Sequence, residues 1–214
     1  MATYDNDPGF TIDTAVAEAY QADIEAITGT LSGYRTALEL GCGSAVFTEF
    51  LSSHVPTVIG VDNSGNQLTE ARQRLPNTRF IQADIASPQF VRDMVESDHT
   101  FDLIATRYVV HELADPIETF LLWKPLLNPS GKVLLIENTW IRQDWGEGDW
   151  GQRTDHLPLA CTQTWATAAY CLQKAGFRVN ACSWMEHTNQ LAASRLLDGF
   201  RLYLILAEVS QVTE

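Results

Sequence analysis

Short apolar runs rich in β-forming residues alternate with helix-sized segments through the first two thirds of this sequence. Alternation of this kind implies a parallel sheet that is wrapped by helices. The expected strands are Thr36–Leu40, Thr57–Asp62, Arg79–Gln82, Phe101–Thr106 and Lys132–Glu137.

The segments between these runs predict helices, and their boundaries carry local signals. Pro88 and Pro116 stand at first-turn positions, where a helix tolerates proline, and the turn Asn128-Pro129-Ser130-Gly131 should close the last helix. An amphipathic segment, Thr14–Ile27, precedes the first strand. The predicted helices are Val46–Ser53, Gly65–Arg74, Pro88–Glu96 and Pro116–Leu127.

The C-terminal third begins with a tryptophan-rich stretch, Trp140–Trp165, whose spacing fits neither a helix nor a strand. It exceeds the usual length of a βα connection, and long loops are more often functional than idle. We therefore expect residues 139–165 to form a lid over a substrate, with a dimer contact or a folded surface loop as the alternative. Beyond it, a helix is expected over Thr164–Lys174 up to Gly176, followed by strands at Phe177–Met185 and Arg201–Val209 that are antiparallel because their connection is short.

Composition restricts the classes of partner. The 214 residues, 45% of them hydrophobic, fit one α/β domain, 1–214, with residues 1–30 as a helical cap segment. A net charge of −13 repels polyanions, so nucleic acid and anionic membranes are not expected partners, whereas a homodimer stays open. The four cysteines show no C-x-x-C or metal-ligand spacing, and no signal peptide or membrane span is evident. We expect reduced thiols, no metal and a cytoplasmic location.

The motif that carries most chemistry is Ala37-Leu38-Glu39-Leu40-Gly41-Cys42-Gly43-Ser44-Ala45, a strand that ends in a glycine turn and opens into a helix. Glycines there let the backbone pass close to a nucleotide-like ligand. Asp62, about 20 residues further on, can accept both hydroxyls of a ribose. A dinucleotide fingerprint would need Gly or Ala where this chain has Val46, and a cofactor without phosphates relaxes that demand.

These residues resemble the class I S-adenosylmethionine-dependent methyltransferases, and the likeness runs from about Tyr4 to the C-terminus. The family's E/D-x-G-x-G-x-G appears as Glu39 to Ala45, with Ala45 in place of the last glycine. The resemblance implies a Rossmann-like α/β fold of seven strands, mostly parallel with an antiparallel last strand, and helices on both faces. Further matches in register are Val58–Ser64, Gln82–Ile85, Phe101–Arg107, Leu127–Leu134 and Ala175–Phe177.

By the same resemblance, each cofactor contact can be placed. Backbone around Gly41, Cys42 and Gly43 cradles the methionine moiety of S-adenosylmethionine, and Glu39 orients its amino group. Asp62 holds the ribose with Asn63 beside it, Asp84 accepts from the adenine amino group, and Ile85 covers the adenine face. Backbone at Thr106 and Arg107 closes the methionine end.

The sequence constrains the methyl acceptor less than it constrains the cofactor. Thr106-Arg107-Tyr108-Val109 stands where nucleic-acid and glutamine N-methyltransferases carry [D/N]-P-P-[Y/F], so a small molecule, for instance a secondary metabolite, is the expected acceptor at an O or N atom. His111 lies just past the expected fourth strand. Three roles stay open for it: a general base, a hydrogen-bond partner of the substrate, or a histidine that holds local structure. Tyr108, Trp140 and Trp145 are the other expected substrate contacts.

Two alternatives to methyl transfer remain at this stage. One is a Rossmann-type NAD(P)-dependent oxidoreductase, which Val46 and the antiparallel last strands disfavour. The other is a methyltransferase-like protein that binds the cofactor without transferring a methyl group, which the cofactor motifs do not exclude.

Overall fold

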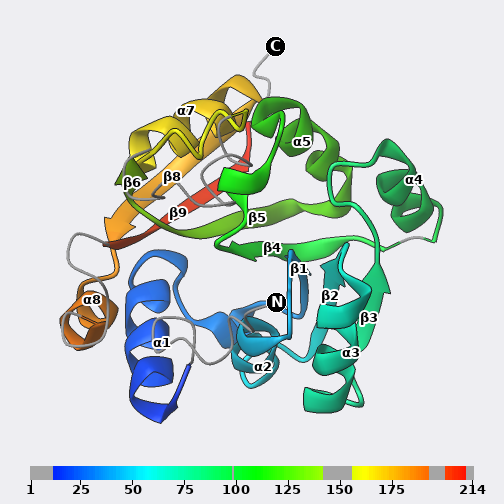
Figure 1. Cartoon of the computed structure of the whole chain (residues 1–214), viewed down its shortest axis with the longest axis horizontal. Coiled ribbons are helices and arrows are strands. Elements are labelled where there is room, and N and C mark those ends of the chain that lie inside the picture. Colours follow the sequence, from blue (N-terminus) through cyan, green and yellow to red (C-terminus); the bar gives the residue numbers. More distant parts are fainter. Residues whose placement is uncertain (1–11, 98, 142–155, 193–200, 211–214) are drawn as a thin grey trace.

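The structure, a computed structural model, describes residues 12–97, 99–141, 156–192 and 201–210. Its centre is a seven-stranded sheet in the order β3-β2-β1-β4-β5-β9-β8 (Figure 1). Neighbouring strands from β3 to β5 are parallel, whereas β9 is antiparallel to both β5 and β8. The strands are β1 (Thr36–Leu40), β2 (Thr57–Asp62), β3 (Arg79–Gln82), β4 (Phe101–Arg107), β5 (Leu127–Asn138), β8 (Phe177–Trp184) and β9 (Leu202–Val209). The fold expected from the resemblance is confirmed.

Helices cover both faces of the sheet because successive strand residues point to opposite sides. Leu38 and Leu40 of β1 pack in one apolar core with α4, α5 and α7, whereas Ala37 belongs to a second core with α1 and α2. The helices are α1 (Thr14–Thr28), α2 (Val46–Ser52), α3 (Gly65–Arg74), α4 (Pro88–Glu96), α5 (Pro116–Trp123), α7 (Trp165–Lys174) and α8 (Glu186–Ala192), with short 3₁₀ turns η2 (Leu31–Gly33), η3 (Val110–Glu112) and η4 (Lys124–Leu126).

Most element boundaries agree with the sequence prediction, and β1, β2, β3, α3 and α4 agree to the residue. The fifth helix is shorter than expected: regular helix ends at Trp123, and the chain tightens into η4 around Pro125, which has no N–H to donate. The expected turn at Asn128–Gly131 is instead an irregularity inside β5, where the register against β4 shifts.

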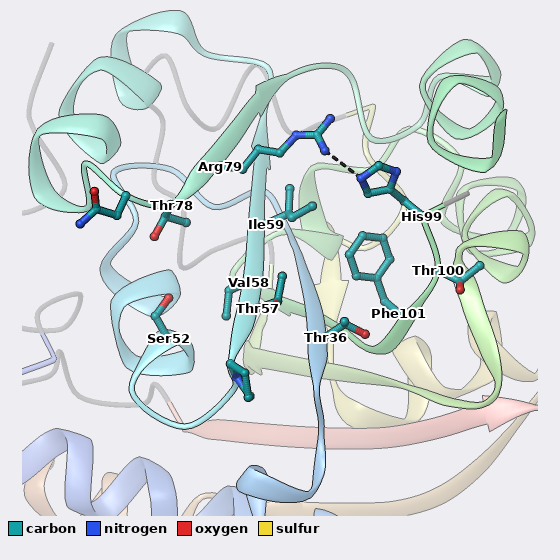
Figure 2. A pocket seen from close by; sticks show the side chains of 12 residues that line it. Thr36, Ser52, Thr57, Val58, Ile59, Thr78, Arg79, His99, Thr100 and Phe101 are labelled. Carbon is teal, nitrogen blue, oxygen red and sulfur yellow. Dashed lines mark hydrogen bonds between the residues drawn. The ribbon is translucent and has the colours of Figure 1, made fainter. Parts of the chain in front are cut away.

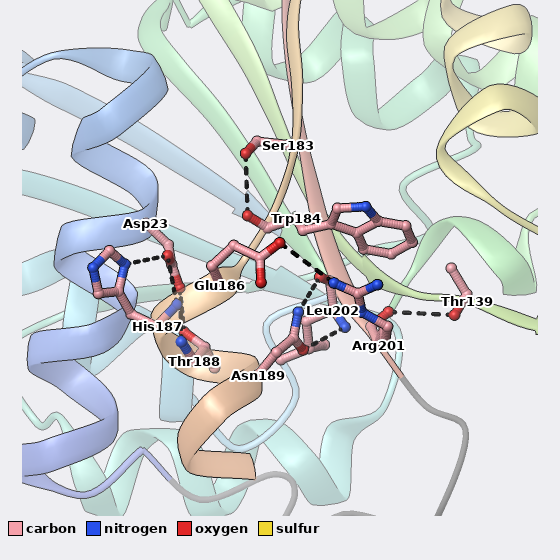
Figure 3. Close-up of polar contacts among 10 residues, drawn as sticks. All are labelled: Asp23, Thr139, Ser183, Trp184, Glu186, His187, Thr188, Asn189, Arg201 and Leu202. Atoms are coloured by element: carbon pink, nitrogen blue, oxygen red, sulfur yellow. Dashed lines mark hydrogen bonds and ion pairs between the residues drawn. The ribbon is translucent and has the colours of Figure 1, made fainter. Parts of the chain in front are cut away.

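The prediction of a short connection between the last two strands was wrong, because α8 stands between β8 and β9. Asp23 of α1 is buried and holds the start of this helix: its Oδ2 accepts from the Thr188 backbone N–H (2.9 Å) and hydroxyl (2.8 Å), and its Oδ1 accepts from the His187 N–H (3.1 Å) (Figure 3). Asn189 exchanges two hydrogen bonds with the Leu202 backbone. These hydrogen bonds link α1, α8 and the start of β9.

The tryptophan-rich stretch is not a loop throughout. Its two ends pair as a two-stranded antiparallel sheet, β6 (Trp140–Ile141) with β7 (Thr162–Gln163). Residues 142–155, which include Trp145, lie outside the described residues. No helix among those that are described is long and apolar enough to cross a membrane.

Candidate functional site

The predicted cofactor residues gather at one edge of the sheet. β1, β2, β3 and β4 are parallel, so their carboxyl ends meet at this edge and bring Glu39, Asp62, Asp84 and Thr106 to it. The chain runs outward from β1 to β3 and then crosses back to β4, so the strand order reverses between β1 and β4. Open α/β sheets bind ligands outside the carboxyl ends of the strands at such a point.

The glycine turn after β1 depends on left-handed backbone. Gly41 and Gly43 have φ angles of +75° and +54°, which glycine adopts without steric cost. A Cβ on Gly41 would also lie 2.4 Å from Cγ2 of Val109, so there is no room for a side chain. Ala45 has a φ of +69°, which explains why a third glycine suits this position in the family motif.

Hydrogen bonds hold the glycine turn after β1 to the end of β2. The N–H groups of Gly41 and Cys42 both donate to the Val61 carbonyl, at 2.8 and 2.9 Å. The Gly43 N–H donates to Asp62 Oδ2 (2.8 Å), and the Ser64 N–H donates to Asp62 Oδ1 (2.8 Å). Each carboxylate oxygen can accept about two hydrogen bonds, so Asp62 is held in place and keeps capacity for a diol.

Glu39 is a buried carboxyl beside this turn, only 1% exposed. It accepts a hydrogen bond from the Thr48 hydroxyl at 2.5 Å. Burial raises the pKa of Glu39 to about 8 and the nearby Asp62 adds to the rise, whereas the Thr48 hydrogen bond and the Arg107 guanidinium oppose it. At neutral pH the Glu39 carboxyl is therefore mostly protonated in the free protein, and a cationic ligand group placed beside it would favour its ionised form.

Arg107, Tyr108 and Tyr20 form a second polar group on the same side of the sheet. The Arg107 guanidinium lies 5.0 Å from the centre of the Tyr108 ring and hydrogen-bonds with Tyr20 of α1. Burial, followed by the neighbouring Tyr20, raises the pKa of the Tyr108 hydroxyl well above its ordinary value. The helix expected as an N-terminal cap thus contributes Tyr20 to the site.

The remaining predicted cofactor residues have distinct settings. Cys42 is buried, and burial followed by the Glu39 and Asp62 carboxylates raises the pKa of its thiol, so we exclude it as a nucleophile. Asp84 is exposed, and its Oδ1 accepts from the Ala86 N–H at 2.9 Å. The Ile85 carbonyl accepts from the Trp123 indole at 3.0 Å, whereas Asn63 is exposed.

A sharp backbone reversal follows β4. Tyr108 has a φ of +58°, a left-handed conformation that costs a bulky residue roughly 1–2 kcal/mol. The next two N–H groups, of Val109 and Val110, both donate to Oε1 of Glu137, at 2.8 and 2.9 Å. Successive amides around a left-handed residue form a concave anion site, and here the anion is the chain's own carboxylate.

Glu137 also meets His111, which the sequence prediction had placed in the acceptor crevice. His111 Nδ1 lies 3.5 Å from Glu137 Oε2, and the imidazole packs edge-on against Trp140, with ring centres 4.4 Å apart. Gln163 of β7 donates to Glu137 Oε2 at 2.9 Å and to the Tyr203 hydroxyl at 3.2 Å. The structure thus brings His111 and Trp140 together, with Tyr108 three residues before His111.

Sequence reasoning missed Glu137 and Gln163. Glu137 carried a signal, since it is an acidic residue at the end of an otherwise apolar strand, next to the crevice. Gln163 had none, because its approach depends on the pairing of β6 with β7. Trp145 is outside the described residues.

A cavity of about 530 Å³ lies at the other end of the sheet (Figure 2). It is lined by the first residues of the parallel strands, including Thr36, Thr57, Arg79 and Phe101, and by His99, which hydrogen-bonds with Arg79 at 2.8 Å. It contains none of the predicted site residues. Within the described ranges, no cluster of three or more His, Cys, Asp or Glu side chains could hold a metal ion.

Comparisons with known proteins match the part of the chain that holds the predicted cofactor residues. A family described as "Methyltransferase domain" matches residues 38–135, the segment from β1 to β5. A trans-aconitate 2-methyltransferase of Escherichia coli O139:H28 is 31% identical over 115 residues, which are 52% of this chain and 42% of that protein. The aligned part therefore spans less than half the length of this curated relative.

Two solved structures share the fold over nearly the whole chain. An S-adenosylmethionine-dependent methyltransferase from Mesorhizobium loti has a TM-score of 0.61 at 21% identity, covering 88% of this chain and 97% of its own. The N-methyltransferase NodS from Bradyrhizobium japonicum, solved with S-adenosyl-L-homocysteine, has a TM-score of 0.61 at 16% identity, covering 97% of this chain and 91% of its own.

Proposed function

We propose that this chain, whose fold and matched segment are those of the class I methyltransferases, is an S-adenosylmethionine-dependent methyltransferase that acts on a small molecule. The resemblance drawn from the motifs is confirmed by that match and that fold. The activity and the acceptor are the proposal. Relatives whose names specify small-molecule methylation support it, as does a net charge that disfavours polyanionic partners.

The observation that carries the proposal is the placement of two fixed carboxyls on either side of a left-handed glycine turn. Asp62 is held by two backbone amides and keeps capacity to accept from a ribose diol, and the buried Glu39 lies beside the same turn, where it would pair with an ammonium group. Between them, Gly41 has no room for a Cβ because Val109 packs against it. These residues fit an adenosyl ligand with an amino-acid tail and no phosphate.

Within this site, the chain's residues have separable tasks. Asp62 binds the ribose, Asp84 and Ile85 border the adenine, and Glu39 orients the amino group. When bound, S-adenosylmethionine supplies an electrophilic methyl group on sulfur. The protein then aligns an oxygen or nitrogen acceptor with that methyl group and excludes water, a task for Tyr108 and His111 after β4 and for Trp140 of β6.

The sheet order separates this proposal from an NAD(P)-dependent oxidoreductase. A dinucleotide-binding sheet continues with parallel strands beyond β5, whereas here the antiparallel β9 lies between β5 and β8. The third position of the dinucleotide fingerprint is Val46, the first residue of α2. A protein that binds the cofactor without methyl transfer is the alternative that only activity can separate.

Two measurements test the proposal. Calorimetric titration should show binding of S-adenosylhomocysteine and no binding of NAD, and the reverse pattern would refute the cofactor assignment. Incubation with methyl-labelled S-adenosylmethionine and a panel of phenols, alcohols, amines and carboxylic acids should label at least one acceptor. Binding without any labelled product would leave the cofactor-binding alternative in its place.

A further inference from the structure

The side chain of Asn138, the last residue of β5, lacks a hydrogen bond that buried polar groups normally make. It is 9% exposed, and its Oδ1 has no hydrogen-bond partner within the described residues. Burying an amide oxygen without a donor is unfavourable, because the oxygen loses its water and gains no partner in return. Binding of a molecule that supplies the missing partner is one reason for a folded protein to keep such a group.

The backbone N–H groups beside Asn138 already have acceptors. The N–H of Leu202, the partner of Asn138 on β9, donates to Asn189 Oδ1 at 2.8 Å. The Thr139 N–H donates to the Arg201 carbonyl at 3.0 Å. The Asn189 side chain also donates to the Leu202 carbonyl at 2.9 Å (Figure 3). Asn189 therefore holds the start of β9 with its amide, whereas Oδ1 of Asn138 takes part in none of these bonds.

The face of the sheet on which the Asn138 side chain lies follows from strand register. Ile136 is level with Arg107 of β4, and Asn138 comes two residues after Ile136, so all three side chains point to one face. Ile136 and Leu202 belong to the apolar core that α1 and α2 cover. The intervening Glu137 points to the opposite face. Asn138 and Arg107 are therefore diagonal neighbours on the face that α1 covers.

β5 extends beyond β4 at the edge of the sheet where the cofactor residues gather. β4 ends at Arg107, and the Tyr108 N–H donates to the Ile136 carbonyl at 3.0 Å where the chain reverses. Asn138 lies two residues beyond Ile136, so β4 is not paired with it. On the side away from β9, Asn138 is therefore bordered by the turn after β4 rather than by a strand.

The order of the strands relates Asn138 to the proposed cofactor. Asp84 follows β3, Asp62 ends β2 and Glu39 lies in β1, so the adenine, ribose and amino group assigned to these residues are arranged in that order along the sheet. The next two strands are β4 and β5. A molecule that receives the methyl group at the methionine end of the cofactor therefore lies over the ends of β4 and β5, where Asn138 is.

We propose that the Asn138 carboxamide binds the methyl acceptor, and that the acceptor carries a hydroxyl or carboxamide group at this point. The inference rests on the proposed methyl transfer and narrows its substrate class. A carboxamide both donates and accepts hydrogen bonds, so a hydroxyl or a second carboxamide satisfies it, whereas a carboxylate cannot donate to Oδ1. The Arg107 guanidinium on the same face repels a cationic amine.

Asn138 and Asn189 form a matched pair of asparagines on either side of Leu202. Asn138→Ala removes an amide whose oxygen has no partner within the described residues. Asn189→Ala removes two hydrogen bonds and leaves the Leu202 N–H without its acceptor. A side chain kept for binding and one kept for stability should therefore respond differently to the same substitution.

The first experiment compares melting temperatures of the full chain without ligand. Asn138→Ala should melt within about 2 °C of the wild type, because no hydrogen bond to Oδ1 is lost, whereas Asn189→Ala should melt about 4–8 °C lower. If Asn138→Ala loses as much as Asn189→Ala, or fails to fold, Asn138 serves stability and the inference is overturned.

The second experiment measures methyl transfer from labelled S-adenosylmethionine to phenols, alcohols and primary amides, and to carboxylic acids and amines that lack those groups. The wild type should turn over acceptors with a hydroxyl or carboxamide group. Asn138→Ala should raise KM for them about 10- to 100-fold, with KM for S-adenosylmethionine changed less than about threefold. Asn189→Ala, the control, should keep both KM values within about threefold of wild type.

Two outcomes of this assay would overturn the inference. One is turnover confined to acceptors without a hydroxyl or carboxamide group, and the other is an equal KM for the acceptor in the wild type and Asn138→Ala. Absence of all transfer by the wild type would instead refute the proposed function, and the acceptor role of Asn138 with it, while the melting comparison would stand.

Discussion

Glu39 should release a proton when an adenosyl ligand binds. Burial raises the pKa of this carboxyl to about 8 in the free protein, so about nine molecules in ten hold the proton at pH 7. An ammonium group placed against Glu39 favours the ionised form and lowers that pKa again. Because binding and ionisation are then linked, the ligand should bind more tightly as pH rises towards 8.

The size of the effect follows from the shift. If the bound ligand returns the pKa of Glu39 to its ordinary value of 4.5, binding at pH 7 releases about 0.9 proton. The dissociation constant should then fall about tenfold between pH 6 and pH 7, equivalent to about 1.4 kcal/mol, and level off above pH 8. Thr48→Val, which removes the hydrogen bond that lowers the pKa of Glu39, should move this plateau to higher pH.

Calorimetry in buffers with different ionisation enthalpies measures the proton count directly. S-adenosylhomocysteine is the ligand, and Glu39→Gln is the control, because it separates the carboxyl from the ligand's own titrating amino group. The wild type should release more protons than the variant at pH 7 and no more than the variant at pH 9. Equal proton release by both proteins at pH 7 would show that Glu39 does not contact the amino group.

Four further results are expected. The raised pKa of Glu39 also affects stability, because the folded state binds an extra proton between about pH 4.5 and 8. The free energy of unfolding of the free protein should therefore fall as pH rises through that range. Urea unfolding curves should show a smaller fall for Glu39→Gln than for the wild type. Asp62→Ala should weaken S-adenosylhomocysteine binding by about 1.5–3 kcal/mol, and an unchanged dissociation constant would mean that the diol lies elsewhere. Gly41→Ala should destabilise the fold by about 2–4 kcal/mol through its positive φ and the contact with Val109, whereas Gly33→Ala, with open space around it, should be nearly neutral in thermal melts. Asp23→Ala should lower the free energy of unfolding by about 1–3 kcal/mol, because the first N–H groups of α8 lose their acceptor. Glu186→Ala, which removes an exposed ion pair with Arg201, should lower it by less than about 1 kcal/mol. Similar losses for the two variants would show that Asp23 contributes no more than a surface charge.

Local signals in the sequence predict the cofactor half of the molecule well. Strands β1 to β3 are short apolar runs between turn residues, and α3 and α4 are N-capped by Ser64 and Ser87, whose hydroxyls accept from the first helical turn. The glycine turn and the strand-end acids follow from residue identity and spacing. These features are set by neighbours in sequence, so pattern alone suffices.

The acceptor half depends on contacts between distant segments. Glu137 reaches back 28 residues to Val109, Gln163 joins it from a strand 26 residues later, and Asp23 holds α8 from 164 residues away. No period or motif encodes such pairings. For the same reason, the short connection expected before β9 was wrong: α8 is recognisable chiefly by its packing on α1 and its bonds to Leu202.

The hydrogen bonds by which Asp23 of α1 holds the start of α8 restrict how the sequences of these two helices can diverge. The family match covers β1 to β5, whereas α1 precedes that segment and α8 follows it. A change in α8 that displaced the His187 and Thr188 amides would need a compensating change at Asp23, so the two flanking pieces must be exchanged as a pair. Chimaeras that graft both pieces from one relative onto the β1–β5 segment of another should fold more often than chimaeras that graft either piece alone.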